Sequence, residues 1–149
     1  KELKDPKNYG GNYNLRKVLQ QTASYLKSNA VIIVISDFIG TEPGWERYVR
    51  MLSQHFDLMG VMVKDQRDRV LPKDVGQYTL KDPYTDKDLY VDVNHYADEY
   101  KKQVEEEEKH IKQVFESIKG GCVLITTDKA YEEPLTRFMR RRQFITMTT

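Results

Sequence analysis

The chain has little cysteine and histidine and no long apolar run: its 149 residues include one cysteine, Cys122, and three histidines. A single cysteine excludes an internal disulfide, and its place in the apolar stretch CVLITT is typical of a small buried side chain. We therefore expect a reducing compartment, the cytoplasm. No segment approaches the roughly 18 apolar residues of a membrane span, so we expect no membrane contact in this piece.

The chain also lacks an excess of charge of either sign, with 24 Lys and Arg against 23 Asp and Glu and a formal net charge of +1. This balance gives no reason to expect nucleic acid as a partner. His55, His95 and His110 do not have the spacing of metal ligands. The sequence contains no Gly-rich phosphate loop, nucleophile elbow or paired-cysteine motif.

The apolar residues alternate between helix and strand patterns. A stripe from Leu15 to Leu26 predicts a helix over 15–27, with Asn12 or Asn14 as its cap. The β-branched run Val31 to Ile35 lacks alternation, which predicts a central parallel strand covered on both faces.

A second helix follows, for which Thr41 is the expected cap, and the run Asp57 to Val63 predicts another buried strand. This order of strand, helix and strand is typical of a right-handed βαβ unit.

The rest of the chain completes the same pattern. QYTL and LYVDV predict a β-hairpin appended to the sheet, and the following stretch predicts a helix of about 24 residues ending at Gly120 and Gly121. Cys122 to Thr126 predicts a third buried strand, and Asp128 can cap a last helix. The fold class predicted is α/β: three layers, with helices on both faces of an open, mostly parallel sheet of three parallel strands and the hairpin, over 1–149 as one domain.

Several polar residues follow the predicted parallel strands directly. In an open parallel sheet, the carboxyl ends of the strands form the crevice that binds ligands. Asp37, Asp65, Thr126, Thr127 and Asp128 come at these ends, and their oxygens suit magnesium. Aspartates in such loops also cap helices and form turns, and we favour that simpler interpretation.

A series of segments in one order resembles a known family. The segments are GGNYNL, VIIVISDFIG, PGWERYVRML, HFDLMGVMVKDQRDRVLP, VGQYTLKDPYTDKDLYVDV and ITTDKAYEEPLTRFMRRR. They resemble the C-terminal half of bacterial proteins of domain-of-unknown-function family 58. These proteins contain a von Willebrand factor A-like (Rossmann-type) domain and are typically encoded beside MoxR-type AAA+ ATPases. The resemblance implies that 1–149 is the C-terminal part of such a domain, without its upstream first strand.

The resemblance also implies a metal-ion-dependent adhesion site, here in degenerate form. Asp37 matches the late aspartate of that site, and Asn14 its Asn-containing loop, but Tyr13 stands where a threonine belongs. The Asp-x-Ser-x-Ser motif is missing from the chain. We expect no bound cofactor in this fragment and a magnesium ion only in the intact parent.

Two functions remain open from the sequence. The first is a non-catalytic protein-interaction domain, which contacts a partner, by analogy a MoxR-type ATPase, through Asn12, Tyr13, Asp37 and Phe38. The alternative is a magnesium-dependent phosphoryl-transfer enzyme. It would use Asp37 as nucleophile, Asp65 for the metal, Thr127 for the phosphate and Lys129 as the required lysine.

Two further expectations concern surfaces. Without its first strand, the sheet would expose an apolar edge at Val31 to Ile35, so we expect a homo-oligomer formed through this edge. The basic run Arg140 to Arg142 should lie at the C-terminus of the last helix, where the helix dipole favours cations.

Overall fold

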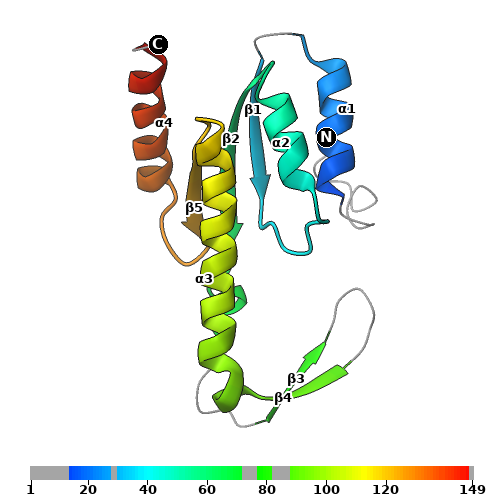
Figure 1. Ribbon diagram of the computed structural model, residues 1–149. Coiled ribbons are helices and arrows are strands. Elements are labelled where there is room, and N and C mark those ends of the chain that lie inside the picture. The colour runs from blue at the N-terminus through cyan, green and yellow to red at the C-terminus, as the bar shows by residue number, and fades with distance from the viewer. Residues whose placement is uncertain (1–13, 28–29, 72–76, 82–87, 148–149) are drawn as a thin grey trace, which may run out of the picture.

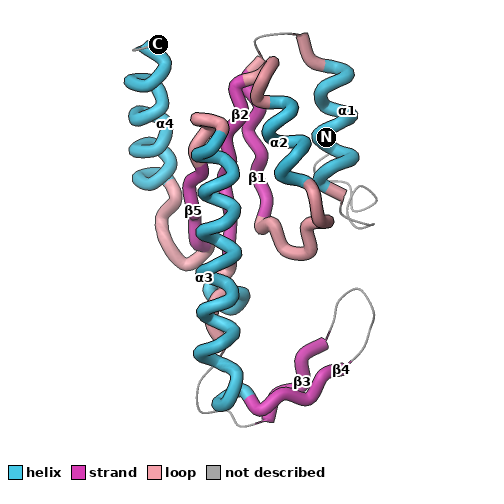
Figure 2. Tube along the Cα trace, viewed as in Figure 1, coloured by secondary structure: helices cyan, strands magenta, loops and turns pink. Residues whose placement is uncertain are grey.

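A computed structural model describes the backbone of residues 14–27, 30–71, 77–81 and 88–147, and the side chains of 14–27, 30–71 and 96–142. Three parallel strands form its central sheet: β1 (Val31–Ser36), β2 (Asp57–Lys64) and β5 (Cys122–Thr126), in the order β1-β2-β5. Figures 1 and 2 show this sheet behind the helices. The predicted α/β class and its three parallel strands are confirmed.

Three helices share one core with the sheet: α1 (Leu15–Tyr25), α2 (Trp45–Leu52) and α3 (Val93–Ser117). Alternate strand residues, Ile32 and Val34 on β1 and Leu58 and Met62 on β2, point into this core. The helices meet them with an apolar stripe each. The contributing helical residues are Leu15, Leu19, Trp45, Val49, Leu52, Ile111, Val114 and Phe115.

The helix boundaries follow from local caps. Asn14 caps α1, because its side-chain oxygen accepts a hydrogen bond from the backbone N–H of Lys17 at 2.7 Å. The predicted Thr41 cap of α2 is wrong: the N-cap is Gly44, with a φ of 88°. A glycine adopts this left-handed conformation without the strain that a Cβ would bring.

The expectation that β1 is a central strand covered on both faces is wrong. In the described part of the chain β1 pairs only with β2, so it is an edge strand. Its burial alternates: Val31, Ile33 and Ile35 are 58%, 45% and 68% exposed. An unbroken apolar run therefore marks the strand here but not its place in the sheet.

Strands β3 (Gln77–Lys81) and β4 (Asp88–Asp92) pair with each other in antiparallel register. They form a sheet of their own, so the prediction that they extend the parallel sheet is wrong. The reason is that α3 starts directly after β4, and only the later part of α3 packs on the parallel sheet. The pair therefore lies at the far end of α3 (Figure 1). The residues that link the two strands, 82–87, lie outside the described residues.

The last helix, α4 (Glu132–Met147), contacts β5 and contributes no described residue to the shared core. The ring of Phe138 lies against Gly121. The prediction that Asp128 caps this helix is wrong, because α4 begins four positions later, at Glu132. None of the helices within the described residues combines the length and the apolar character that crossing a bilayer requires.

Candidate functional site

The segment that links β1 to α2, residues 37–44, begins at the carboxyl end of β1, and we call it the Asp37 loop. Asp37 is exposed at its start, and its Oδ1 accepts a hydrogen bond from the backbone N–H of Ile39 at 3.1 Å. The hydroxyl of Ser36 accepts another from the N–H of Phe38 at 3.0 Å. These local bonds orient the carboxylate while leaving it open to solvent.

Phe38 anchors the Asp37 loop to the core. Its side chain is only 5% exposed, and its ring centroid lies 5.6 Å from that of Trp45 and 6.0 Å from that of Phe115. Its φ of 57° turns the chain so that the ring points inward next to an exposed aspartate. Phe38 is one of the predicted contact residues, and aromatic packing holds its ring inside the protein.

Asn14 provides a second anchor. While its oxygen caps α1, its Nδ2 donates to Oε1 of Glu42 at 2.8 Å. Arg16 lies 3.6 Å from the other oxygen of Glu42. The start of α1 and the Asp37 loop are thus joined. Asn12 and Tyr13, the other predicted contact residues, lie outside the described residues.

The geometry does not fit the cation site that the family resemblance implies. The Oδ1 atom of Asn14, its only candidate ligand atom, is used by the backbone N–H of Lys17. Among the described residues, no group of three or more His, Cys, Asp or Glu side chains could hold a metal ion. Asp37 and Asn14 are therefore better explained as turn and cap residues than as magnesium ligands.

A hollow of about 520 Å³ lies between the Asp37 loop and α3. Four carboxylates line it, those of Glu42, Glu46, Glu106 and Glu107. His110 of α3 also lines it and lies 3.1 Å from Oε1 of Glu46, so this pair joins α2 to α3. We call this hollow the acidic hollow.

Glu46 remains ionised in this setting. Partial burial alone would raise its pKa, but hydrogen bonds from its own backbone N–H and from His110 outweigh that effect, so its pKa is lowered. The acidic hollow therefore keeps a negative charge on Glu46 at neutral pH.

Asp65 and Thr127 lie at the carboxyl ends of β2 and β5, as predicted, and the structure brings them together. The hydroxyl of Thr127 donates to Oδ2 of Asp65 at 2.9 Å, and the N–H of Arg67 donates to its Oδ1 at 2.9 Å. These bonds, that from Arg67 first, lower the pKa of Asp65. Both oxygens of Asp65 are thus engaged in joining two loops, and none of these bonds involves Asp37.

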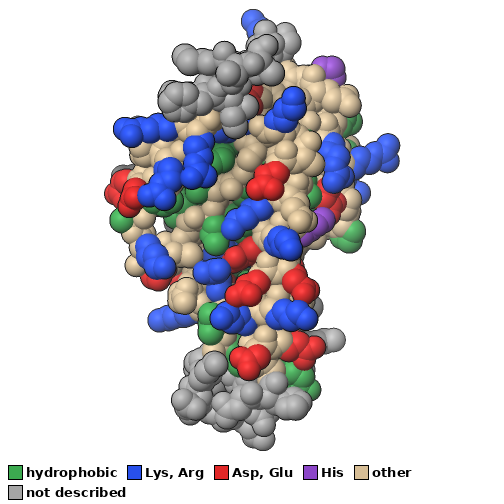
Figure 3. All heavy atoms as spheres, turned by 60° about the vertical axis from the view of Figure 1, so that its left-hand side comes forward, with side chains coloured by type: hydrophobic (Ala, Val, Ile, Leu, Met, Phe, Trp, Pro, Cys, Tyr) green, Lys and Arg blue, Asp and Glu red, His purple; other side chains and the backbone are tan. Residues whose placement is uncertain are grey.

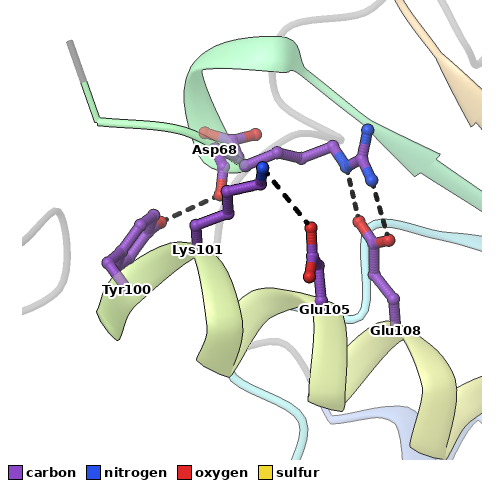
Figure 4. A network of polar contacts seen from close by, with 6 residues as sticks. Asp68, Tyr100, Lys101, Glu105 and Glu108 are labelled. Carbon is purple, nitrogen blue, oxygen red and sulfur yellow. Dashed lines mark hydrogen bonds and ion pairs between the residues drawn. The ribbon is translucent and has the colours of Figure 1, made fainter. Parts of the chain in front are cut away.

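A polar network that the sequence did not reveal fixes the segment after β2 to α3 (Figure 4). Glu108, 5% exposed, accepts two hydrogen bonds from Arg69, at 2.6 and 3.0 Å. The hydroxyl of Tyr100 donates to the carbonyl oxygen of Asp68 at 2.9 Å. Glu108 ends a run of four glutamates that is typical of a solvated helix face. The sequence pattern therefore gave no sign that Glu108 is buried.

Comparison with known families identifies the family of this chain. Residues 2–110 match the family model described as "Protein of unknown function DUF58". The chain belongs to the DUF58 family. No match was found among curated proteins or among solved structures. The DUF58 match includes the whole Asp37 loop and, except for Ile111, the residues that line the acidic hollow, whereas β5 and α4 follow it.

Proposed function

We propose that this DUF58 chain is a non-catalytic protein-interaction domain, and that the Asp37 loop and the acidic hollow form its contact surface. The observation that carries the proposal is the contrast between two neighbouring side chains. Asp37 is exposed, while Phe38 is locked between Trp45 and Phe115. A charged group on a fixed loop binds a partner with little loss of conformational entropy.

The charge of this surface indicates the kind of group that it would receive. The acidic hollow brings four carboxylates close to the Asp37 loop. Opposite charge at an interface guides association and selects partners. A lysine or arginine side chain of the partner, placed in the acidic hollow, would meet this requirement.

The partner that the family resemblance suggests is a MoxR-type AAA+ ATPase. In the proposed arrangement the sheet acts as a rigid platform, and the loop after β1 meets the ATPase. Magnesium has no part in this proposal, because Asn14 and Asp37 do not form a metal site here.

The alternative of a phosphoryl-transfer enzyme has less support. That chemistry needs a nucleophilic carboxylate beside a metal site. Asp65, the candidate metal ligand, is engaged by Thr127 and Arg67, and Thr127 donates its hydroxyl proton to Asp65 rather than to a phosphate.

Titration of a MoxR-type ATPase from the same organism into the labelled chain tests the proposal. We expect Asp37→Ala to weaken binding about five- to tenfold, as for a charge at an interface. Glu99→Ala, which removes the same charge near the start of α3, is the matched control and should bind like wild type. Equal affinity of wild type and Asp37→Ala would overturn the proposal.

A further inference from the structure

The basic run at Arg140 to Arg142 does not lie where the sequence suggests. The helix α4 continues beyond it to Met147, so these arginines do not face the C-terminal end of their own helix. Arg142 interacts instead with the segment between α3 and β5: its Nη1 donates to the carbonyl oxygens of Lys119 and Gly120, both at 2.6 Å. Its Nη2 donates to Asp57. Arg142 therefore has a structural role that its neighbours do not share.

The two arginines before Arg142 do not share its contacts. Arg140 and Arg141 are exposed, and within the part of the chain that the structure describes neither makes a hydrogen bond or an ion pair. With Arg137, which pairs with Glu133 one turn earlier, they line a hollow of about 650 Å³ on α4. Figure 3 brings the side of the molecule that bears α4 forward and shows Lys and Arg side chains over much of it, with acidic side chains between them.

We propose that Arg137, Arg140 and Arg141 form a docking surface for an acidic helical segment of a partner protein. Arg140 and Arg141 come three and four positions after Arg137, so the three side chains lie on one face of α4. Carboxylates at the same spacings on a partner helix would face them. Arginine suits this role because its planar guanidinium binds a carboxylate through two parallel hydrogen bonds.

The acidic residues nearby favour a protein over a polyanion. Glu132 and Glu133 line the same hollow as the arginines. A nucleic acid or an anionic membrane presents negative charge continuously and would be repelled at these two positions. A helix that carries glutamates opposite the arginines and a lysine opposite Glu132 avoids this repulsion. This surface is on α4, so the proposal does not depend on the function proposed for the Asp37 loop.

Fluorescence anisotropy with the full chain tests the docking surface. The probe is a labelled alanine-based helical peptide with glutamates three and four residues apart followed by a lysine, and the same peptide with glutamines is the negative control. We expect the Arg140→Gln/Arg141→Gln double variant to bind the glutamate peptide about tenfold more weakly at low salt. Arg47→Gln/Arg50→Gln removes two exposed arginines from α2 and is the matched control.

The outcomes separate the possibilities. The proposal is supported if only the α4 double variant loses affinity for the glutamate peptide and the glutamine peptide binds little. An equal loss of affinity in the α2 control variant would show a general charge effect and would overturn the proposal. Tighter binding of a single-stranded oligonucleotide or of phosphatidylglycerol vesicles than of the peptide also overturns it, as does no measurable binding of the peptide. Circular dichroism of each variant confirms that it is folded.

Discussion

Asn14 and Glu42 stand 28 positions apart in the sequence, yet Nδ2 of Asn14 donates to Oε1 of Glu42 at 2.8 Å. The same asparagine caps α1 through its oxygen. One side chain therefore both starts a helix and holds the Asp37 loop, so its two roles can be separated by substitution.

Substitution of Asn14 should destabilise the protein in two steps. Asn14→Ala loses both the cap and the bond to Glu42, and we expect the free energy of unfolding to fall by about 1–2 kcal/mol. Asn14→Ser keeps a capping oxygen but cannot reach Glu42 in the same way, so its loss should be smaller. Urea unfolding measures both values. Equal losses in the two variants would show that the cap contributes little and that the bond to Glu42 carries the effect.

The pair of Arg69 and Glu108 gives the largest expected effect. The carboxylate is 6% exposed and the guanidinium 26%. Arg69→Met leaves a buried carboxylate without its partner, which should cost about 2–3 kcal/mol, less than for a fully buried pair because Arg69 is partly exposed. The double variant Arg69→Met/Glu108→Met should recover much of this loss. Chemical denaturation of the single and double variants provides the comparison, and additive losses would contradict the coupling.

Glu46 should make stability depend on pH in acid. Its pKa is lowered in the folded protein from an ordinary value of 4.5. The unfolded chain therefore binds a proton more readily, and the stabilisation by Glu46 is complete above pH 4.5 and lost as the pH falls through the lowered pKa. We expect the difference in stability between wild type and Glu46→Gln to shrink below pH 4.5. Thermal unfolding across pH 3–7 tests this, and a difference that grows in acid would contradict it.

Cys122 should be a slow nucleophile. Burial raises the pKa of its thiol to about 11, so little thiolate exists at neutral pH. At pH 8 we expect iodoacetamide to alkylate the native protein on the order of a hundredfold more slowly than the urea-unfolded chain. Mass spectrometry follows the modification. Equal rates in the two states would show that the thiol is accessible.

The exposed face of β1 should promote self-association. Val31, Ile33 and Ile35 project from an edge strand, and exposed apolar edges tend to pair with other chains. We expect sedimentation velocity to show oligomers that increase with concentration, and Ile35→Lys to reduce them because a charge on the edge opposes pairing. A wild-type monomer at every concentration would contradict this prediction.

The sequence predicted the helices and strands better than the way in which they pack and pair. Local patterns are sufficient for α1, for the βαβ unit and for β5, which begins and ends where its apolar run does. The position of β1 at the edge depends on which other strand pairs with it, and a β-branched run carries no information on that.

Contacts with residues distant in the sequence also explain why the packing around the Asp37 loop was not predicted. Phe38 follows an aspartate in a loop and looks exposed, but Trp45 and Phe115, the latter far along the chain, bury it. Glu108 is one of four consecutive glutamates, and only the distant Arg69 distinguishes it. The place of Asp37 at the end of β1 was therefore predictable, and the contacts that hold the loop in place were not.

The measurement that tests the central claim most directly is incubation of the protein with acetyl phosphate and magnesium, with mass spectrometry for phosphorylation and an assay for released phosphate. The account holds that Asp37 is presented for contact, and it predicts that wild type and Asp37→Asn behave alike, with no phosphoprotein and no turnover above buffer. Phosphorylation or turnover that disappears in Asp37→Asn would contradict it.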